Sequence, residues 1–349
     1  MCKCLSVLSG KGKQYGLMLA GALLATMFAV TGAVAAEPKV RVLATTYPVY
    51  LLTRAVAQSS PDVQVDLLIP AQTGCPHDYA LTPKDMQKLS QARIVVINGL
   101  GLEAFLEKPL ASSGKIKVID SSAGITPIAE DQDDDHDAGH AATDKAHEAD
   151  HAVAAAKGHE PHDKGHEAAH EHGHEHGGAN PHIFSSPLQA AAMVRNIGRG
   201  LAAAEPVAAK NCPEAAEAYA ARLETLAQRM AAVGANAANK NVVALHDGMA
   251  YLVRDAGLNL VDVIQEDEEA QPSAARLLEL VKKIKESKPV VLIGEPQYSD
   301  KPVRALAKET GVPAVQLDPL ASGPTNAPLD YYETVMTKNC TILEKYFVK

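Results

Sequence analysis

Eight short apolar runs rich in β-branched residues constrain the fold of this 349-residue chain more than any other sequence feature. Stretches with a helical pattern alternate with these runs, and such alternation is typical of βαβ units and parallel sheets. We therefore predict an α/β protein made of two similar (βα)-repeat lobes, each with a parallel sheet. The expected strands form two series, Val40–Ala44, Val63–Leu68, Arg93–Asn98 and Lys117–Ile119, then Val242–Leu245, Leu258–Ile264, Val290–Ile293 and Ala314–Leu317.

A long stretch rich in Ala, Glu and Arg, residues 214–239, separates the two series and contains no proline. As one helix of about 26 residues it would extend roughly 39 Å and connect the lobes rigidly. The predicted parts are thus an N-terminal lobe over residues 37–204, a connector helix over residues 205–240 and a C-terminal lobe over residues 241–349. Other helices are expected from Pro83, from near Pro187, and over Ala274–Glu286, Val303–Glu309 and Tyr331–Tyr346.

The N-terminus has the pattern of a secretory signal peptide. Lysines precede the apolar run Leu17–Val30, and small residues follow at 33–36, so we predict a signal peptide over residues 1–36, cleaved after Ala35 or Ala36. The alternative is an uncleaved membrane anchor, for which the run is short. No cysteine follows the run where a lipid-modified cysteine would lie. We therefore expect a soluble protein in the periplasm of a Gram-negative-type cell, with no stable membrane insertion after cleavage.

Residues 130–178 hold eleven of the fourteen histidines, interleaved with Asp, Glu, Gly and Ala. Almost no large apolar side chains are available there to offset the entropy of ordering the segment, so we expect a disordered loop. Its composition predicts an accessory segment that binds additional zinc weakly. The histidines of this tract are His136, His140, His147, His151, His159, His162, His166, His170, His172, His174 and His176.

The acidic balance of the chain comes from the same tract. The formal charge is −9, whereas the tract alone carries fourteen acids against three lysines, a net of −11, which leaves the rest of the chain near +2. Neither balance gives the basic surface that nucleic acid requires, and only 4% of the residues are aromatic. Nucleic acid is therefore excluded as a partner.

The three histidines outside the tract are the candidates for a defined metal site. His77, His182 and His246 each follow an expected strand or loop end, where an open α/β sheet presents its ligand-binding crevice. Asp318 holds a similar position directly after the last expected strand. Three imidazoles and one carboxylate are the ligand set expected for zinc.

In combination and in order, five segments resemble the zinc-specific solute-binding proteins of ABC transporters, the ZnuA/TroA type of cluster A-I. The resemblance extends over nearly all of the chain beyond the expected signal peptide. The segments are Pro-His-Asp-Tyr-x-Leu-Thr-Pro at 76–83, Asn-Pro-His-Ile at 180–183, Leu-His-Asp at 245–247, Gly-Glu-Pro-Gln-Tyr at 294–298 and Leu-Asp-Pro-Leu at 317–320.

The resemblance implies a metal site in the cleft between the lobes, with His77 and His182 from the first lobe and His246 and Asp318 from the second. It implies a monomer that captures Zn²⁺ with high affinity and delivers it to an ABC-transporter permease. Manganese-binding relatives tend to carry a carboxylate in place of His246, which favours zinc; a binding protein for manganese or another divalent metal is the alternative. The sequence has no P-loop motif, so ATP hydrolysis is expected in a partner polypeptide.

One segment departs from the family pattern. The common Asp-Pro-His-x-Trp-x-Asp-Pro sequence is Asn-Pro-His-Ile-Phe-Ser-Ser-Pro at 180–187, which lacks two acids near His182. The residues that support His182 are thus left open, as is the choice of Asp318, water or both as the fourth ligand. We interpret Glu295 as a residue that supports a ligand or caps a helix, with a fifth metal ligand as the alternative. The acidic run at 266–269 is interpreted as a solvated loop, with docking to a permease or a secondary cation site as the alternatives.

An enzyme is the alternative from another functional class. Three H-E-x-x-H matches begin at His147, His166 and His170, but a metalloprotease needs that motif on a rigid packed helix, and this tract has no apolar face. A zinc hydrolase could instead use the three isolated histidines with an open fourth position for water, which Asp318 would close. We predict that the protein is not an enzyme.

Three cysteines remain after the expected cleavage, in a compartment that permits disulfides. Cys212 and Cys340 lie in two expected helices and are the candidate disulfide. Cys75, two residues before His77, is either a small buried residue or a soft additional metal ligand.

Overall fold

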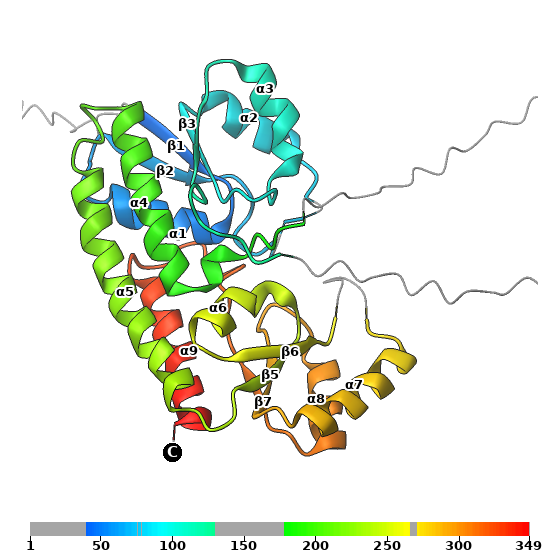
Figure 1. The fold of residues 1–349 in the computed structure, drawn as a ribbon. Coiled ribbons are helices and arrows are strands. Elements are labelled where there is room, and N and C mark those ends of the chain that lie inside the picture. The colour runs from blue at the N-terminus through cyan, green and yellow to red at the C-terminus, as the bar shows by residue number, and fades with distance from the viewer. Residues whose placement is uncertain (1–39, 75, 78, 130–177, 266–270, 349) are drawn as a thin grey trace, which may run out of the picture. The chain divides into compact units, whose positions relative to one another are not determined.

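The computed structural model describes residues 40–74, 76, 77, 79–129, 178–265 and 271–348 (Figure 1). The expected signal peptide, the eleven histidines of the tract, Cys75 and the acidic run at 266–269 lie outside this described part. Within it, no helix is long and apolar enough to span a membrane.

Two four-stranded parallel sheets form the framework, and both have the same strand order. The first is ordered β2-β1-β3-β4 and the second β6-β5-β7-β8. This confirms the predicted α/β fold, and each strand boundary lies within one residue of its expected position. The strands are β1 (Val40–Ala44), β2 (Val63–Leu67), β3 (Ile94–Ile97), β4 (Lys117–Asp120), β5 (Asn241–Ala244), β6 (Asn259–Val263), β7 (Val291–Gly294) and β8 (Ala314–Gln316).

Helices follow or connect the strands. The α-helices of the described residues are α1 (Tyr47–Ala57), α2 (Pro83–Gln91), α3 (Glu107–Ser113), α4 (Pro187–Ala204), α5 (Cys212–Asn236), α6 (Ala250–Asp255), α7 (Ala274–Ser287), α8 (Lys301–Thr310) and α9 (Tyr331–Phe347). Short 3-10 turns are η1 (Ala104–Leu106), η2 (Ile183–Ser185) and η3 (Asp247–Met249).

The sequence patterns did not predict α1, α3 or α6. Nine of the eleven residues of α1 are buried, so this helix has no polar face that would reveal a helical period. The other two helices have only seven and six residues, fewer than a periodic pattern needs.

One apolar core extends through both sheets. On β1, Val42 and Ala44 contribute to it, and on β5 Val242 does the same. The alternate residues Leu43 and Val243 point to the opposite faces and belong to two smaller, separate clusters. All described residues lie in one compact unit. Because the central core is shared, a wide separation of the two sheets would expose apolar surface to water, which is unfavourable.

The predicted long helix is present as α5, with 25 residues, and it packs along α4 over much of its length. Gly198 of α4 permits this contact, because a Cβ there would lie 2.5 Å from the Cβ of Ala216. The C-terminal helix α9 lies beside α5 (Figure 1) and also contacts α1. The C-terminal helix, which follows the second sheet, thus packs on helices of the first half of the chain. The predicted boundaries of the lobes and the connector helix, at residues 204, 240 and 241, remain a prediction.

The predicted Cys212–Cys340 disulfide is wrong, because both thiols are free and buried. Cys212 begins α5, with its Sγ 3.4 Å from the Oγ of Ser60. The Sγ of Cys340 lies 3.8 Å from Glu344 and interacts with Arg229. Arg229 is seventeen residues along α5 from Cys212, about 25 Å at the rise of a helix, whereas bridged Cα atoms lie within about 7 Å.

Candidate metal-binding site

Two of the four predicted ligands directly follow strands of the second sheet, and the other two lie in connections of the first half. His77 lies in the loop from β2 to α2, and His182 directly precedes η2 and α4. His246 is two residues beyond β5, and Asp318 is two residues beyond β8. The carboxyl ends of the strands form the edge at which open parallel sheets bind ligands.

The start of α2 fixes the loop that carries His77. The Thr82 side chain accepts from the backbone N–H of Asp85, and the Asp85 carboxylate accepts from the backbone N–H of Thr82 in a capping box. The Tyr79 hydroxyl also donates to Asp85, at 2.8 Å. These bonds fix the backbone from Tyr79 onward, two residues after His77, and they require no metal.

His77 and His182 are already paired. Their Nε2 atoms lie 3.2 Å apart, and the ring planes meet at 64°. Two nitrogens bound to one tetrahedral zinc at about 2.0–2.1 Å would be separated by about 3.3–3.4 Å. The pair therefore has the spacing that one tetrahedral zinc ion requires.

Burial keeps the His182 imidazole neutral. The residue is only 4% exposed, and this burial, with a smaller contribution from His246, lowers its pKa from 6.5 to about 4. Its Nδ1 lies 3.0 Å from the Oδ1 of Asn180. A neutral imidazole is the form that binds metal, so His182 can bind at neutral pH without first losing a proton.

A buried carboxyl group supports the His182 segment from the first sheet. Glu103 accepts hydrogen bonds from the hydroxyl of Thr45 and the backbone N–H of Asn98, at 2.6 and 2.7 Å. The Asn98 side chain then donates to the carbonyl oxygen of Pro181, at 2.9 Å. Burial raises the pKa of Glu103 from 4.5 to about 7.

His246 is buried without ordinary hydrogen bonding. It is 1% exposed, and neither ring nitrogen has a hydrogen-bond partner among the described residues. The Oε1 of Glu295 lies 3.4 Å from its Nδ1, within the range of an ion pair when the imidazole is protonated. The ring of Tyr298 packs edge-on at 4.3 Å. Buried polar atoms are rarely left unpaired, so these nitrogens fit a site for a cation.

The Asp318 carboxylate is half-buried and held in place. Its Oδ1 accepts hydrogen bonds from the side chain of Gln297 at 2.6 Å and from the backbone N–H of Leu320 at 2.8 Å. Asn339 of α9 bonds to the backbone N–H and carbonyl of Asp318. Burial raises the pKa of this carboxyl.

The structure assembles only part of the predicted ligand set. Among the residues that it describes, no group of three or more His, Cys, Asp or Glu side chains is spaced to hold a metal ion. His77 and His182 meet, and neither His246 nor Asp318 joins them in a group of that kind. The complete four-ligand set thus remains a prediction, as do the accessory histidines and the role of Cys75.

Sequence reasoning did not identify two residues that contact His182. Asp247 lies 3.9 Å from its Nδ1, and Asn180 lies between the two side chains. Both residues belong to the quoted motifs, but the contact between them is distant in sequence. No local pattern could have predicted it.

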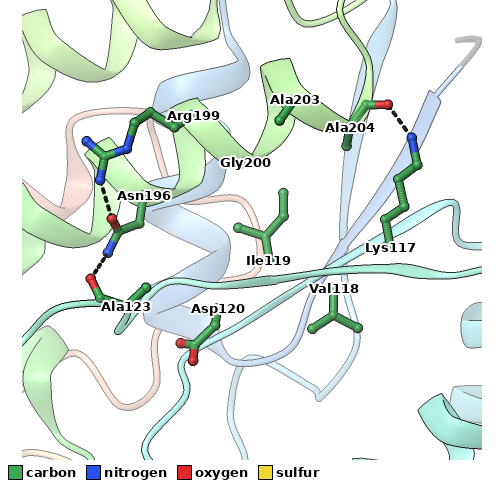
Figure 2. A pocket seen from close by; sticks show the side chains of 10 residues that line it. All are labelled: Lys117, Val118, Ile119, Asp120, Ala123, Asn196, Arg199, Gly200, Ala203 and Ala204. Atoms are coloured by element: carbon green, nitrogen blue, oxygen red, sulfur yellow. Dashed lines mark hydrogen bonds between the residues drawn. The ribbon is translucent and has the colours of Figure 1, made fainter.

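A cavity of about 580 Å³ lies elsewhere, between β4 and α4. Figure 2 shows that its polar side chains bond to neighbouring protein groups: Asn196 donates to Ala123 at 2.8 Å and accepts from Arg199 at 2.5 Å. None of the four predicted ligands lines this cavity. It is therefore distinct from the candidate metal site.

Comparison with known families identifies the chain. Residues 42–346 match the family described as zinc-uptake complex component A, periplasmic, or ZnuA. The chain belongs to this family. The resemblance predicted from the five motifs is thus confirmed, and the ZnuA family is one of metal-uptake components and not of hydrolases.

Relatives of this ZnuA-family chain include longer proteins. Zinc-binding lipoprotein AdcA of Streptococcus pneumoniae is 29% identical over 340 residues, 95% of this chain and 61% of that protein. Zinc-binding protein AdcA of Streptococcus pyogenes is 31% identical over 315 residues, 89% of this chain and 56% of that protein. The chain thus spans about three fifths of the length of these curated relatives.

A solved structure supports the fold of this ZnuA-family chain. The Zn(II)-bound ZnuA-like domain of S. pneumoniae AdcA is 26% identical and superposes with a TM-score of 0.66, covering 89% of this chain and all of that domain. Both AdcA relatives are named as metal-binding proteins and neither as an enzyme, which agrees with the prediction that the protein is not an enzyme.

Proposed function

We propose that this protein captures Zn²⁺ in the periplasm and delivers it to the permease of an ABC transporter. The observation that carries the proposal is the pair formed by His77 and His182, with a 3.2 Å separation that fits a single tetrahedral zinc. The unpaired buried nitrogens of His246 supply a third imidazole nearby. Membership of the ZnuA family and the zinc-binding relatives support the same ligand.

The proposed ligands are His77, His182, His246 and Asp318. Zinc binds first to the assembled imidazole pair, and His246 and Asp318 then move inward to complete the shell. Neutral imidazoles favour zinc, whereas manganese prefers sites made mostly of oxygen atoms. This donor set therefore favours zinc over manganese.

The shared core limits how the protein can respond to zinc. Residues of β1, β5 and the helices between the sheets pack in one apolar cluster. Opening the molecule widely would expose that cluster, at about 25 cal/mol for each Å² of apolar surface. We propose that loading proceeds by shifts of side chains and short loops, with the sheets held in place.

The remaining parts of the proposal come from the sequence. The signal peptide directs the chain across the inner membrane, and the mature protein acts as a monomer. The tract of eleven histidines binds further zinc weakly and raises the local supply. ATP hydrolysis is supplied by the transporter that receives the ion.

Zinc competition titration tests the site. Wild type is compared with His182→Ala and His246→Ala, and His170→Ala serves as a matched control inside the tract. We expect one tight zinc in wild type and in the control, and loss of that tight site in His182→Ala and in His246→Ala. Retention of one tight zinc by both of these variants would overturn the proposed site. Tighter binding of manganese than of zinc would favour the alternative cargo.

A further inference from the structure

Asn180 lies between His182 and a carboxylate from the second sheet. Its Oδ1 accepts from the backbone N–H of His182 at 2.9 Å and lies 3.0 Å from the Nδ1 of the same residue. Its Nδ2 donates to the Asp247 carboxylate at 2.8 Å and to the Asp247 backbone carbonyl at 3.2 Å. Asn180 is 2% exposed, so water does not compete for these bonds.

The partners of Asn180 fix the direction of its amide. A backbone N–H can only donate, so the atom facing His182 is the amide oxygen. A backbone carbonyl can only accept, so the atom facing Asp247 is the amide nitrogen. Because Oδ1 is an acceptor, the Nδ1 of His182 carries its proton, and the lone pair is on Nε2, the atom directed at His77.

The backbone of Asn180 is held as firmly as its side chain. Its N–H donates to the carbonyl of Ile128 at 2.9 Å, and its carbonyl accepts from the Tyr251 hydroxyl at 2.7 Å. Tyr251 belongs to α6, which follows the second sheet, and Asp247 begins η3 just before that helix. Both bonds from the second half of the chain therefore converge on the one residue that orients His182.

We propose that Asn180 is a positioning residue that couples Asp247 to His182 and holds His182 as the Nδ1–H tautomer, with Nε2 presented to the metal. This inference rests on the proposed function. It also explains why the acid of the common motif is absent: a carboxylate at position 180 would face that of Asp247 across 2.8 Å, and like charges at that distance repel. An amide at position 180 can donate to the Asp247 carboxylate, which a second carboxylate there could not do.

The test combines ¹⁵N NMR of the metal-free protein with zinc titration of the full chain. Histidines are labelled with ¹⁵N, and the His182 signals are assigned by their loss in His182→Ala. Wild type should show a protonated Nδ1 and an unprotonated Nε2. In Asn180→Ala we expect a mixture of both tautomers and a 10- to 100-fold weaker zinc affinity, the usual cost of losing such a support.

A charge-conserving swap keeps the proposal testable if Asn180→Ala fails to fold. The double variant Asn180→Asp/Asp247→Asn places the carboxylate beside His182 and the amide on the other side. The bonds to His182, the bond between the two side chains and the net charge are retained, whereas the 3.2 Å bond to the backbone carbonyl of residue 247 is lost. We expect the wild-type tautomer and an affinity within about threefold of wild type. Loss of the tautomer or a tenfold weaker affinity in this variant would overturn the proposal.

Gln189→Ala is the matched control for a general loss of contact between the two halves. Gln189 of α4 donates to Asp255 of α6 at 2.7 Å, an amide–carboxylate bond of the same type away from the histidines. It should leave both the tautomer and the affinity unchanged. Equal losses of zinc affinity in Gln189→Ala and Asn180→Ala would mean that Asn180 only connects the two halves of the protein, and would refute the inference.

The experiment separates the inference from the proposed function. If His182→Ala keeps the tight zinc, the proposed site fails. If His182→Ala loses the zinc while Asn180→Ala keeps both the tautomer and the affinity, only the role of Asn180 fails.

Discussion

The two halves of the candidate site differ in how far the protein organises them without metal. In the half from the first sheet, His77 and His182 lie 3.2 Å apart, and Asn180 orients the second imidazole. In the half from the second sheet, His246 is buried with neither ring nitrogen hydrogen-bonded, and the Asp318 carboxylate is held by protein donors through one oxygen. The two imidazoles of the first half make hydrogen bonds, whereas the His246 imidazole of the second half would gain its missing interactions from a cation.

We propose that this difference gives the two halves separate roles in zinc binding. A preformed pair loses little entropy on binding, so it can capture the ion first. A half that rearranges to reach the ion can release it when the surroundings change.

Removal of one ligand from each half should have unequal effects on zinc affinity. We expect His77→Ala to weaken binding by more than about 100-fold, because it removes half of the preformed pair, and Asp318→Asn to weaken it by about 10-fold. Competition titration with a chromophoric chelator measures both. Equal losses in the two variants would contradict the unequal organisation of the halves.

The pH dependence of the metal-free protein should separate two buried groups of the first half. His182, with a pKa lowered from 6.5 to about 4, makes folding less favourable as pH falls through that range. Glu103, with a pKa raised from 4.5 to about 7, acts in the opposite sense, because its contribution is lost as pH rises through that range. Each shift corresponds to about 3 kcal/mol, so the two slopes largely cancel between pH 4.5 and 6.5.

Glu103→Gln should therefore reveal the slope of His182. We expect the free energy of unfolding to rise more steeply from pH 4.5 to 6.5 in this variant than in wild type, although its absolute stability falls because a hydrogen bond is lost. Urea unfolding at steps of pH measures both quantities. The reverse control, His182→Phe, should leave only the slope of Glu103, and an unchanged slope in both variants would refute the opposing titrations.

Apolar substitution of one histidine in each half should change the stability of the metal-free protein with opposite signs. His182→Phe removes the Nδ1–H that donates to the Oδ1 of Asn180. This change should lower the free energy of unfolding by about 1–3 kcal/mol. His246→Phe removes two unpaired buried nitrogens and should raise it by about 1 kcal/mol. Urea unfolding in the presence of a chelator measures both, and a loss of stability in both variants would show that His246 is satisfied within the protein.

Deletion of the histidine tract should have the smallest effect on the tight site. Ala129 and Ala179 pair in an antiparallel bridge, so a two-glycine linker can replace residues 130–177. We expect calorimetry to find one tight zinc with unchanged affinity and loss of the weak sites. Disappearance of the tight site would mean that the tract supplies a ligand to it.

The fold was largely predictable because its strands are short apolar runs with clear boundaries. All eight strands were expected, and α5 was expected from a proline-free stretch. The fully buried helix α1 was not, since a helix without a polar face shows no period. The disulfide prediction failed because helix membership alone does not say which ends of two helices meet, and Cys212 and Cys340 lie near different ends of α5.

The sequence by itself determined the family, the two-sheet α/β framework and the histidines worth testing, since each of these is written in local motifs and in strand and helix periods. Only the tertiary structure decided which of those histidines meet and what orients them. The contact from Asp247 through Asn180 to His182 joins residues 67 positions apart. Such a contact depends on how two sheets pack on a shared core, which no local pattern encodes.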